Sequence, residues 1–552
     1  MKEKLKIVPL GGLNEIGKNM TAVEFGNDII VIDCGMAFPD DDMLGVDLVI
    51  PDITYLKRNK DKLRGFVITH GQEDHIGALP YVLRELNTPV YGTRLTLGII
   101  DVKLSEFRFP HKIRLNCVKA GDVIKLGCFK VEFIRTNHSI ADSVALAIKT
   151  PIGTVIHTGD FKIDTTPVNG EMIDLTRFDQ LGNEGVLALM SDSTNAERDG
   201  FTMSEKTVGD SMEEYFKNCE ERIIIATFAS NINRLQQILD IAAKYGRKVA
   251  VCGRSLEKNT EVAMKLGYLH DKKKVQIPIQ EINRHPRNRI VVICTGSQGE
   301  SMSALYRMAY SGHKQVEVVP GDKILIAASA IPGNEKSVYN MINELFKKGA
   351  EVIYDRQAAI HVSGHANRGE LKMMLGLCKP KFFIPVHGEH RHLRLHAELA
   401  KEMGVQPRNI MVSDIGRVIE ISENSARLAG NVPAGRVLVD GLGIGDVGTA
   451  VLRDRKHLSQ DGLLVVVVTL DSESGIVIAG PDIVSRGFIY VKEAEDLMEQ
   501  LRKESQKSLN RCMDKHIRNW SVIKSSLKND LSEFLFKKTK RSPMILPVIM
   551  EI

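Results

Sequence analysis

The chain has 552 residues, of which 43% are hydrophobic and 26% charged, and its formal net charge is +5. These values are typical of a soluble globular protein with about three or four domains. They exclude a membrane-spanning class, because the longest apolar run, residues 463–468, is far shorter than a span. The eight scattered cysteines form no C-x-x-C pair and the N-terminus shows no signal-peptide core, so we expect a reducing, cytoplasmic location without membrane contact.

Residues 1–200 are predicted to be rich in β-strands with short helices. Strands are expected at residues 29–33, 65–69, 129–134 and 154–158, each ending in a small or polar loop. The second of these strands is followed by the loop HGQEDH, residues 70–75. The spacing is that of a metal-binding loop in which the third position is normally another histidine, whereas this chain has Gln72.

From about residue 204 onward, helices and strands alternate. Residues 206–360 contain a serine-capped helix, the buried strand RIIIATF and an amphipathic helix closed by Gly246, followed by the strands KVAVCG and RIVVICTG. This order predicts an α/β domain with a parallel sheet. The glycine-rich residues 436–455 are predicted to form a linker, and residues 456–552 a final unit of strands and basic helices.

Positive charge is concentrated near the C-terminus. Residues 501–541 hold twelve Lys or Arg and four Asp or Glu. A basic segment on a near-neutral body is consistent with a polyanionic partner. A solvated helix face carrying long basic side chains explains the same pattern equally well.

Candidate metal ligands follow several of the predicted strands. His70 and Gln72 alternate along an extended loop and can face one ion, whereas Asp74 and His75 diverge and can face a second. Further candidates at later strand ends are His138, Asp160 and His387. Imidazoles and carboxylates are ligands that zinc and manganese prefer, and one carboxylate can bridge two ions. Two ions about 3.5–4 Å apart would polarise a phosphodiester and activate water for attack on it.

The order of these motifs resembles that of the metallo-β-lactamase fold. The α/β domain inserted between TGD and PVHGE is similar to the β-CASP branch of that fold, and within this branch the chain resembles the ribonuclease J family. The resemblance runs nearly end to end, through PLGGLNEIGKNM, SDSTNAERDGFT, ATFASNINRLQQI, CTGSQGE, HVSGHANRGEL and PVHGEHRHL. It implies an αββα sandwich formed by residues 1–205 and 361–435, a β-CASP α/β insert at 206–360, and a small α+β C-terminal oligomerisation domain at 456–552.

The resemblance also implies an activity. Members of this family look like metal-dependent ribonucleases of rRNA processing and mRNA decay that combine 5′-to-3′ exonuclease with endonuclease activity. The implied substrate is single-stranded RNA, with a preference for a 5′-monophosphate end. Two divalent ions are expected, zinc first and manganese as the alternative. The implied assembly is a homodimer or homotetramer, or a complex with a paralogous subunit.

Individual residues take roles from the same resemblance. One ion would be held by His70, position 72, His138 and Asp160, and the other by Asp74, His75, Asp160 and His387, with Asp160 bridging. Asp192 and His365 would be catalytic, with His365 stabilising charge on the scissile phosphate or the leaving oxygen. The 5′-phosphate pocket would be formed by Ser230, Asn231, Ser363, Gly364, His365 and Ala366, at strand-to-helix transitions where N–H groups can bind anions. The alternative for Ser230 and Asn231 is that they simply cap a helix beginning at Asn233.

Gln72 leaves three protein ligands around one ion, a number compatible with a catalytic zinc. Our hypothesis is that the fold and RNA binding survive while hydrolysis is weakened. A ribonuclease with one altered ligand is therefore the first interpretation, and a catalytically impaired RNA-binding subunit of an active paralogue is the second. The second predicts the loss of several ligands, whereas this chain departs from the pattern at one. A small-molecule hydrolase is disfavoured by the inserted domain and the SGHA motif.

Overall fold

The computed structural model describes residues 3–168, 170–217, 219–330, 334–354, 359–471, 476–489 and 495–552. The chain divides into two compact units. The first comprises Met1–Phe38 and Leu48–Val437, and the second comprises Pro39–Asp47 and Leu438–Ile552. None of the helices within the described ranges combines the length and apolar character that a membrane span requires.

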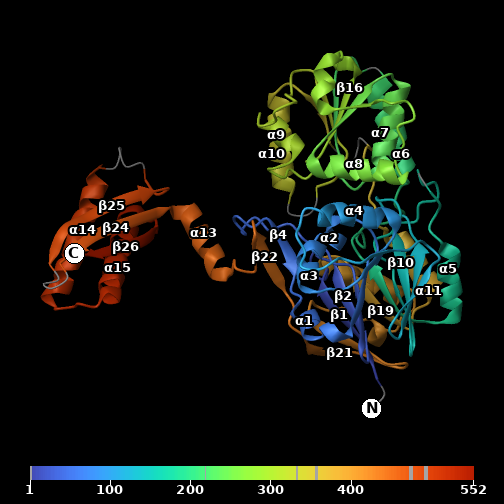
Figure 1. Ribbon diagram of the computed structural model, residues 1–552, viewed down its shortest axis with the longest axis horizontal. Helices are drawn as coiled ribbons and strands as arrows, with labels where there is room; N and C mark the ends of the chain where they lie inside the picture. Colours follow the sequence, from blue (N-terminus) through green and yellow to red (C-terminus); the bar gives the residue numbers. More distant parts are fainter. Residues whose placement is uncertain are drawn as a thin grey trace. The chain divides into compact units, whose positions relative to one another are not determined.

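The first unit is built around two sheets (Figure 1). The eight-stranded sheet has the order β21-β20-β1-β2-β3-β5-β6-β7, and the six-stranded sheet has the order β19-β12-β11-β10-β9-β8. The strands of the first sheet are β1 (Leu5–Gly11), β2 (Met20–Phe25), β3 (Asp28–Ile32), β5 (Leu63–Val67), β6 (Val90–Gly92), β7 (Leu115–Cys117), β20 (Arg417–Ile421) and β21 (Ala426–Asn431). Those of the second are β8 (Val123–Leu126), β9 (Phe129–Arg135), β10 (Val144–Thr150), β11 (Gly153–His157), β12 (Val186–Asp192) and β19 (Phe382–Val386).

The sheets pack on each other because their strands alternate apolar side chains between two faces. In β10, Val144 and Leu146 join the core shared with β1, β2 and β3, while Ala145 and Ala147 face the opposite side. That opposite side is covered by α5 (Leu175–Glu184), α11 (Arg368–Cys378) and α12 (His390–Glu402). The helices that accompany the other sheet are α1 (Thr54–Arg58), α2 (Glu73–Ile76), α3 (Leu79–Glu85) and α4 (Arg94–Leu104). The predicted αββα sandwich is confirmed.

The insert forms its own parallel sheet within the first unit, and helices lie on both sides of this sheet (Figure 1). Its strand order is β15-β14-β16-β13-β17-β18. The strands are β13 (Ile223–Ala226), β14 (Lys248–Cys252), β15 (Gln276–Ile277), β16 (Ile290–Cys294), β17 (Lys323–Ile326) and β18 (Glu351–Ile353). The helices are α6 (Glu205–Lys217), α7 (Ile232–Lys244), α8 (Arg254–Leu266), α9 (Ala304–Ala309) and α10 (Glu335–Lys347). The predicted parallel α/β insert is confirmed, and its β13 and β16 flank the point where the strand order reverses, the place where such sheets bind ligands.

The second unit has a three-stranded sheet of order β25-β24-β26 with two long helices against it. Its elements are α13 (Thr449–Asp461), β24 (Leu463–Leu470), β25 (Val477–Arg486), α14 (Glu495–Asp514), α15 (Trp520–Thr539) and β26 (Met544–Glu551). Apolar residues of β24 such as Val466 and Val468 pack against Leu509 and Leu531 of the helices.

The stretch 436–455 differs from the predicted linker. It contains β22 (Arg436–Asp440), β23 (Gly443–Ile444) and the first half of α13. The pairs Val439↔Ile444 and Asp440↔Gly443 close a hairpin over two residues, and the first of these, Gly441, has a φ of 57°. Tight hairpin turns need positive φ values that glycine adopts without cost. This glycine therefore serves an ordered turn, which composition alone does not distinguish from a linker.

Candidate metal centre

The candidate ligands lie after the carboxyl ends of neighbouring strands. His70 and Gln72 follow β5, His138 follows β9, Asp160 follows β11 and His387 follows β19. Residues 70–75 were predicted to be loop throughout, but α2 begins at Glu73, and Asp74 and His75 lie in this short helix. Consecutive side chains of a helix point in different directions, yet Nε2 of His75 and Oδ2 of Asp74 come within 3.4 Å of each other.

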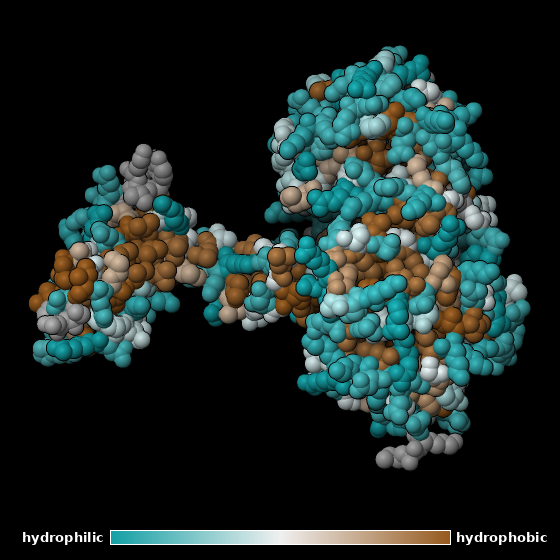
Figure 2. Space-filling view, viewed as in Figure 1, coloured by the Kyte–Doolittle hydropathy of each residue, from teal (hydrophilic) through white to brown (hydrophobic). Residues whose placement is uncertain are grey.

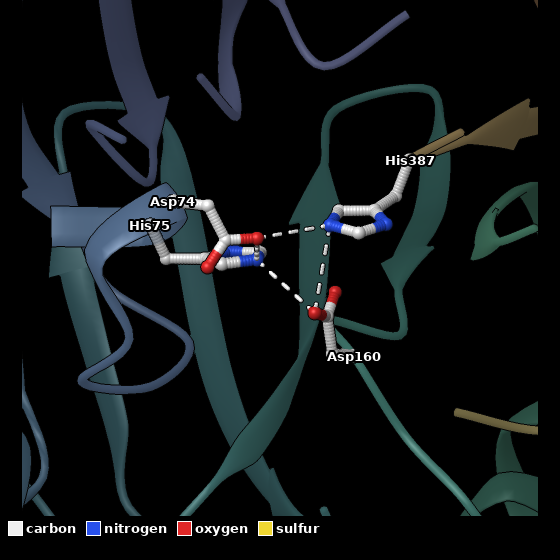
Figure 3. A group of neighbouring side chains, drawn as sticks. All are labelled: Asp74, His75, Asp160 and His387. Carbon is white, nitrogen blue, oxygen red and sulfur yellow. Dashed lines mark hydrogen bonds and ion pairs between the residues drawn. The ribbon is translucent and has the colours of Figure 1, made fainter. Parts of the chain in front are cut away.

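Four side chains form the first group of possible ligands (Figure 3). Nε2 of His75 lies 3.2 Å from Oδ2 of Asp160 and 3.4 Å from Oδ2 of Asp74. Nε2 of His387 lies 3.2 Å from the same oxygen of Asp74 and 3.6 Å from Oδ2 of Asp160. Two nitrogens and two oxygens at these separations can be ligands of one zinc or manganese ion.

A second group shares Asp160. It contains His70 and His138, whose Nε2 atoms each lie 3.9 Å from Oδ2 of Asp160. Oε1 of Gln72 lies 3.0 Å from Nε2 of His138 and 3.4 Å from Nε2 of His70. The structure therefore brings together all seven residues that the sequence predicted as ligands or as the altered ligand position.

Hydrogen bonds fix the orientation of the four imidazoles. Nδ1 of His75 donates to Oδ2 of Asp33 over 2.7 Å, and Nδ1 of His138 donates to the carbonyl oxygen of Gly364 over 2.8 Å. Nδ1 of His387 lies 2.6 Å from the hydroxyl of Thr194. Since a carboxylate can only accept, the Thr194 hydroxyl donates to Asp192, 2.7 Å away, and accepts from His387.

A similar pair of hydrogen bonds, through a threonine hydroxyl to a carboxylate, holds His70. Its Nδ1 lies 3.0 Å from the hydroxyl of Thr69, which in turn donates to the carboxylate of Asp33 over 2.9 Å. Each of the four rings thus has a hydrogen-bond acceptor at Nδ1, and each leaves Nε2 directed at the shared carboxylate. Such partners are characteristic of metal-ligating histidines, so the residues present fit a pair of divalent cations.

Asp192 and His365 lie beside this centre. Nδ1 of His365 is 2.8 Å from Oδ2 of Asp192 and 3.9 Å from Oδ2 of Asp160. Asp192 and His365 form a further group of possible ligands with Asp160 and His387. The structure therefore places both predicted catalytic residues next to the shared carboxylate.

Charged groups in the site shift one another's pKa values. Burial raises the pKa of Asp160, but His387 and His75 outweigh burial and hold it well below its ordinary value. Burial lowers the pKa of His387, but Asp160, Asp74 and Asp192 outweigh burial and raise it to about 9. The three carboxylates of Asp74, Asp160 and Asp192 lie close together, and their negative charge favours the binding of cations at this site.

The predicted phosphate-pocket motifs approach the metal centre from two sides. The hydroxyl of Ser230 lies 3.5 Å from Nε2 of Gln72, and the backbone of Gly364 contacts His138. Asn195 donates to the hydroxyl of Ser363 over 2.8 Å and to the carbonyl oxygen of His365 over 2.9 Å.

Two members of the predicted pocket have other structural roles. Oδ1 of Asn231 accepts from the backbone N–H of Arg234 over 2.9 Å and caps α7, which begins at Ile232 rather than at Asn233. The side chain of Ala366 is 1% exposed and lies in the core beneath α11. A phosphate could therefore contact Ala366 only through its backbone.

Residues that were not expected from the sequence also hold the site. Asp33, Thr69, Thr194 and Asn195 contact predicted ligands or pocket residues rather than an ion. Asp33 has a local signal in the sequence, because it is a carboxylate at the end of a predicted strand, in the motif VIDCG. In the structure it adopts a positive φ of 59°. Thr69 adjoins the ligand that it contacts, His70, whereas Thr194 and Asn195 contact residues that are distant in the sequence.

Models of four protein families match successive parts of the chain. Residues 13–187 match the metallo-beta-lactamase superfamily, and residues 220–345 match the ribonuclease J beta-CASP domain. Residues 349–411 match the Zn-dependent metallo-hydrolase RNA specificity domain, and residues 450–552 match the ribonuclease J C-terminal domain. Fold, ligand geometry and these matches define a metal-dependent hydrolase of the metallo-β-lactamase superfamily.

Similar proteins extend over the whole chain. It is 43% identical over 550 residues to "Ribonuclease J2" of Bacillus subtilis (strain 168), covering 100% of this chain and 99% of that protein. It is 44% identical over 548 residues to "Ribonuclease J 1" of Streptococcus pyogenes serotype M3, covering 99% and 97%. The chain belongs to the ribonuclease J family.

A solved structure shares the fold. A protein of unknown function from Enterococcus faecalis V583 superposes with a TM-score of 0.52 at 16% sequence identity. The match covers 76% of this chain and 100% of that chain.

Proposed function

We propose that this chain is a metal-dependent ribonuclease that degrades single-stranded RNA from the 5′ end, cuts it internally, and prefers a 5′-monophosphate. One observation carries the proposal. Side chains from four distant parts of the sequence converge on two adjacent ligand sets that share Oδ2 of Asp160. Family membership supports RNA as the substrate, and the paired sets support phosphodiester hydrolysis.

The two sets would hold two divalent ions, zinc or manganese. Bound there, the ions would polarise the scissile phosphate and activate the attacking water. The chain's own residues position this chemistry. Asp33 and Thr194 hold ligand rings by hydrogen bonds to Nδ1, and Asp160 is buried between the two sets.

Asp192 orients His365 in this proposal. Nδ1 of His365 donates to Asp192. Burial lowers the pKa of His365, but Asp192 outweighs burial and raises it, which favours the protonated ring. The protonated ring carries a hydrogen on both nitrogens, so its Nε2 can donate to the scissile phosphate or the leaving oxygen. The side chain of His365 is 19% exposed, whereas that of His387 is 5% exposed. His365 is therefore the more accessible of these two rings to a bound RNA strand.

The 5′-phosphate pocket is proposed at the edge where Ser230, Ser363 and Gly364 approach the centre. Ser230 follows β13, at the reversal point of the insert's sheet, and lies directly before the cap of α7. Backbone N–H groups at such a helix start favour anions. A terminal monophosphate bound there would place the adjoining nucleotides beside the metal centre.

The catalytically impaired subunit stays a second candidate because of Gln72. Both candidates predict RNA binding, but they differ in turnover and in partners. A subunit of this kind would gain activity only on mixing with an active paralogue.

The test measures mononucleotide release from RNA carrying a 5′-monophosphate or a 5′-triphosphate. We expect faster release from the monophosphate form, and loss of release in Asp160→Asn, because this substitution removes the carboxylate charge that both ligand sets share. Equal rates for both ends would contradict the pocket. Activity unchanged in Asp160→Asn would contradict the metal centre, and activity that appears only with a paralogue would favour the second candidate.

A further inference from the structure

Gln72 has its two amide ends in different surroundings. Its Nε2 donates to the hydroxyl of Ser139 over 2.8 Å and lies 3.5 Å from that of Ser230. Its Oε1 lies 3.0 Å from Nε2 of His138 and 3.4 Å from Nε2 of His70. The amide nitrogen thus contacts hydroxyls, and the amide oxygen faces the two imidazoles.

No hydrogen is available between this oxygen and either ring in its neutral form. His138 uses its single N–H at Nδ1, toward the carbonyl of Gly364, and His70 uses its own toward Thr69. Both Nε2 atoms therefore present lone pairs, as Oε1 of Gln72 does. Oδ2 of Asp160, 3.9 Å from each Nε2, adds a negative charge.

Four electron-pair donors facing one another without a hydrogen repel unless a cation lies among them. A half-turn of the amide would relieve the repulsion in the absence of an ion, because the NH₂ group would then donate to both rings. The orientation with the oxygen inward is therefore the one suited to an ion. In this orientation Nε2 donates to the hydroxyl of Ser139, so both ends of the amide would have a partner when an ion is bound.

We infer that Gln72 supplies an oxygen ligand to the ion held by His70, His138 and Asp160, and that it shifts this position toward manganese. The inference rests on the proposed metal centre and goes beyond the hypothesis that position 72 has simply lost a ligand. With Gln72 this set offers two nitrogens and two oxygens, whereas histidine would give three nitrogens. Oxygen donors suit manganese, and imidazole suits zinc.

The neighbouring set provides an internal comparison. His75, His387, Asp74 and Asp160 already offer two nitrogens and two oxygens. Gln72 therefore makes the two positions alike in donor type. A change at residue 72 should alter one of two bound ions and leave the other in place.

The experiment uses the full-length chain stripped of metal and dialysed against buffers with a series of Mn²⁺:Zn²⁺ ratios. Ions per chain are measured by elemental analysis for the unmodified protein, Gln72→His and Gln72→Leu. We expect two tightly held ions in the first two proteins, whereas Gln72→Leu, which offers no donor atom at position 72, should hold one ion tightly and the other more weakly. Partners of metal ligands contribute roughly 10- to 100-fold to affinity, so a direct ligand should shift the exchange midpoint at least about tenfold. Gln72→His should therefore require at least about tenfold more manganese to displace zinc from the affected position.

Gln280→His is the matched control, because it adds a histidine on an exposed turn of the insert, outside the site. It should leave the number of ions and the exchange midpoint unchanged. Two ions held equally tightly in Gln72→Leu, or the same midpoint in Gln72→His, would overturn the inference. Two ions with the expected manganese shift but no RNA cleavage would support it while contradicting the proposed function. A chain that binds no ion at any ratio would contradict both.

Discussion

Gly364 lies where any side chain would meet a candidate metal ligand, His138. A Cβ at this position would lie 2.6 Å from Cε1 and 2.7 Å from Nδ1 of His138. Gly364→Ala should push the ring out of its hydrogen bond to the Gly364 carbonyl. Because partners of this kind contribute roughly 10- to 100-fold to metal affinity, we expect one of the two ions to bind that much more weakly. Metal titration of the stripped protein measures the change.

The control for this substitution is Gly430→Ala in β21. A Cβ there meets no atom within 4 Å, so metal affinity should be unchanged. Circular dichroism should show the same fold for both variants. Two ions bound by Gly364→Ala as tightly as by the unmodified chain would show that the ring is not held by this contact.

At the scale of elements, the insert is held by a buried ion pair between α6 and α7. The side chain of Arg234 is fully buried, and its Nε donates to Oε1 of Glu205 over 2.6 Å. Its Nη1 donates to the carbonyl oxygens of Ala327 and Ile360 over 3.0 and 3.1 Å. This single guanidinium links α7 to α6 and to two loops of the chain.

Glu205→Gln should destabilise the protein by about 3–5 kcal/mol, because it leaves a buried guanidinium without its counter-charge. Urea unfolding followed by circular dichroism measures the loss. Glu213→Gln is the matched control, since Glu213 pairs with Lys244 between the same two helices at the surface, where solvent screens the pair. Equal losses of stability in the two variants would contradict a special role of the buried pair.

The elements themselves were largely predictable from the sequence. The strands expected at 29–33, 65–69, 129–134 and 154–158 begin within two residues of β3, β5, β9 and β11. They were recognisable because apolar runs of only five or six residues, rich in β-branched or aromatic side chains and followed by polar loops, favour a strand over a helix. The ordered hairpin at Gly441 was missed, since a glycine-rich segment has the same composition in a turn and in a linker.

The candidate ligands were predictable for a similar reason, because each follows a strand within a short motif. The residues that orient these ligands were not predictable. Thr194 contacts His387 across 193 positions of sequence, and Gly364 contacts His138 across 226. Such partners are set by how the two sheets and α11 pack, and no local pattern records that packing. The inward orientation of the Gln72 oxygen likewise depends on Ser139 and on its distances to two rings.

At the scale of the whole molecule, the second unit has an apolar sheet face that its helices do not cover. Val466 and Val468 of β24 point into the core, so the alternate residues Val465 and Val467 point to the other face. On the neighbouring strands Val484 is 45% exposed and Leu546 is 51% exposed. Figure 2 shows extensive apolar surface on this unit. Sheet faces toward water are normally polar, so this face has the character of a contact between subunits.

Leu546→Glu should therefore weaken the homodimer or homotetramer expected for this family. A carboxylate buried there without a partner costs several kcal/mol, so the subunit dissociation constant should rise by about a hundredfold or more. Sedimentation over a range of protein concentrations measures this change. Val522→Glu is the control, because Val522 is an apolar residue of α15 with a similar exposure of 46%, and it should leave assembly unchanged. Assembly unaffected by Leu546→Glu, or an unmodified chain that is monomeric at every concentration, would exclude this sheet face as the interface.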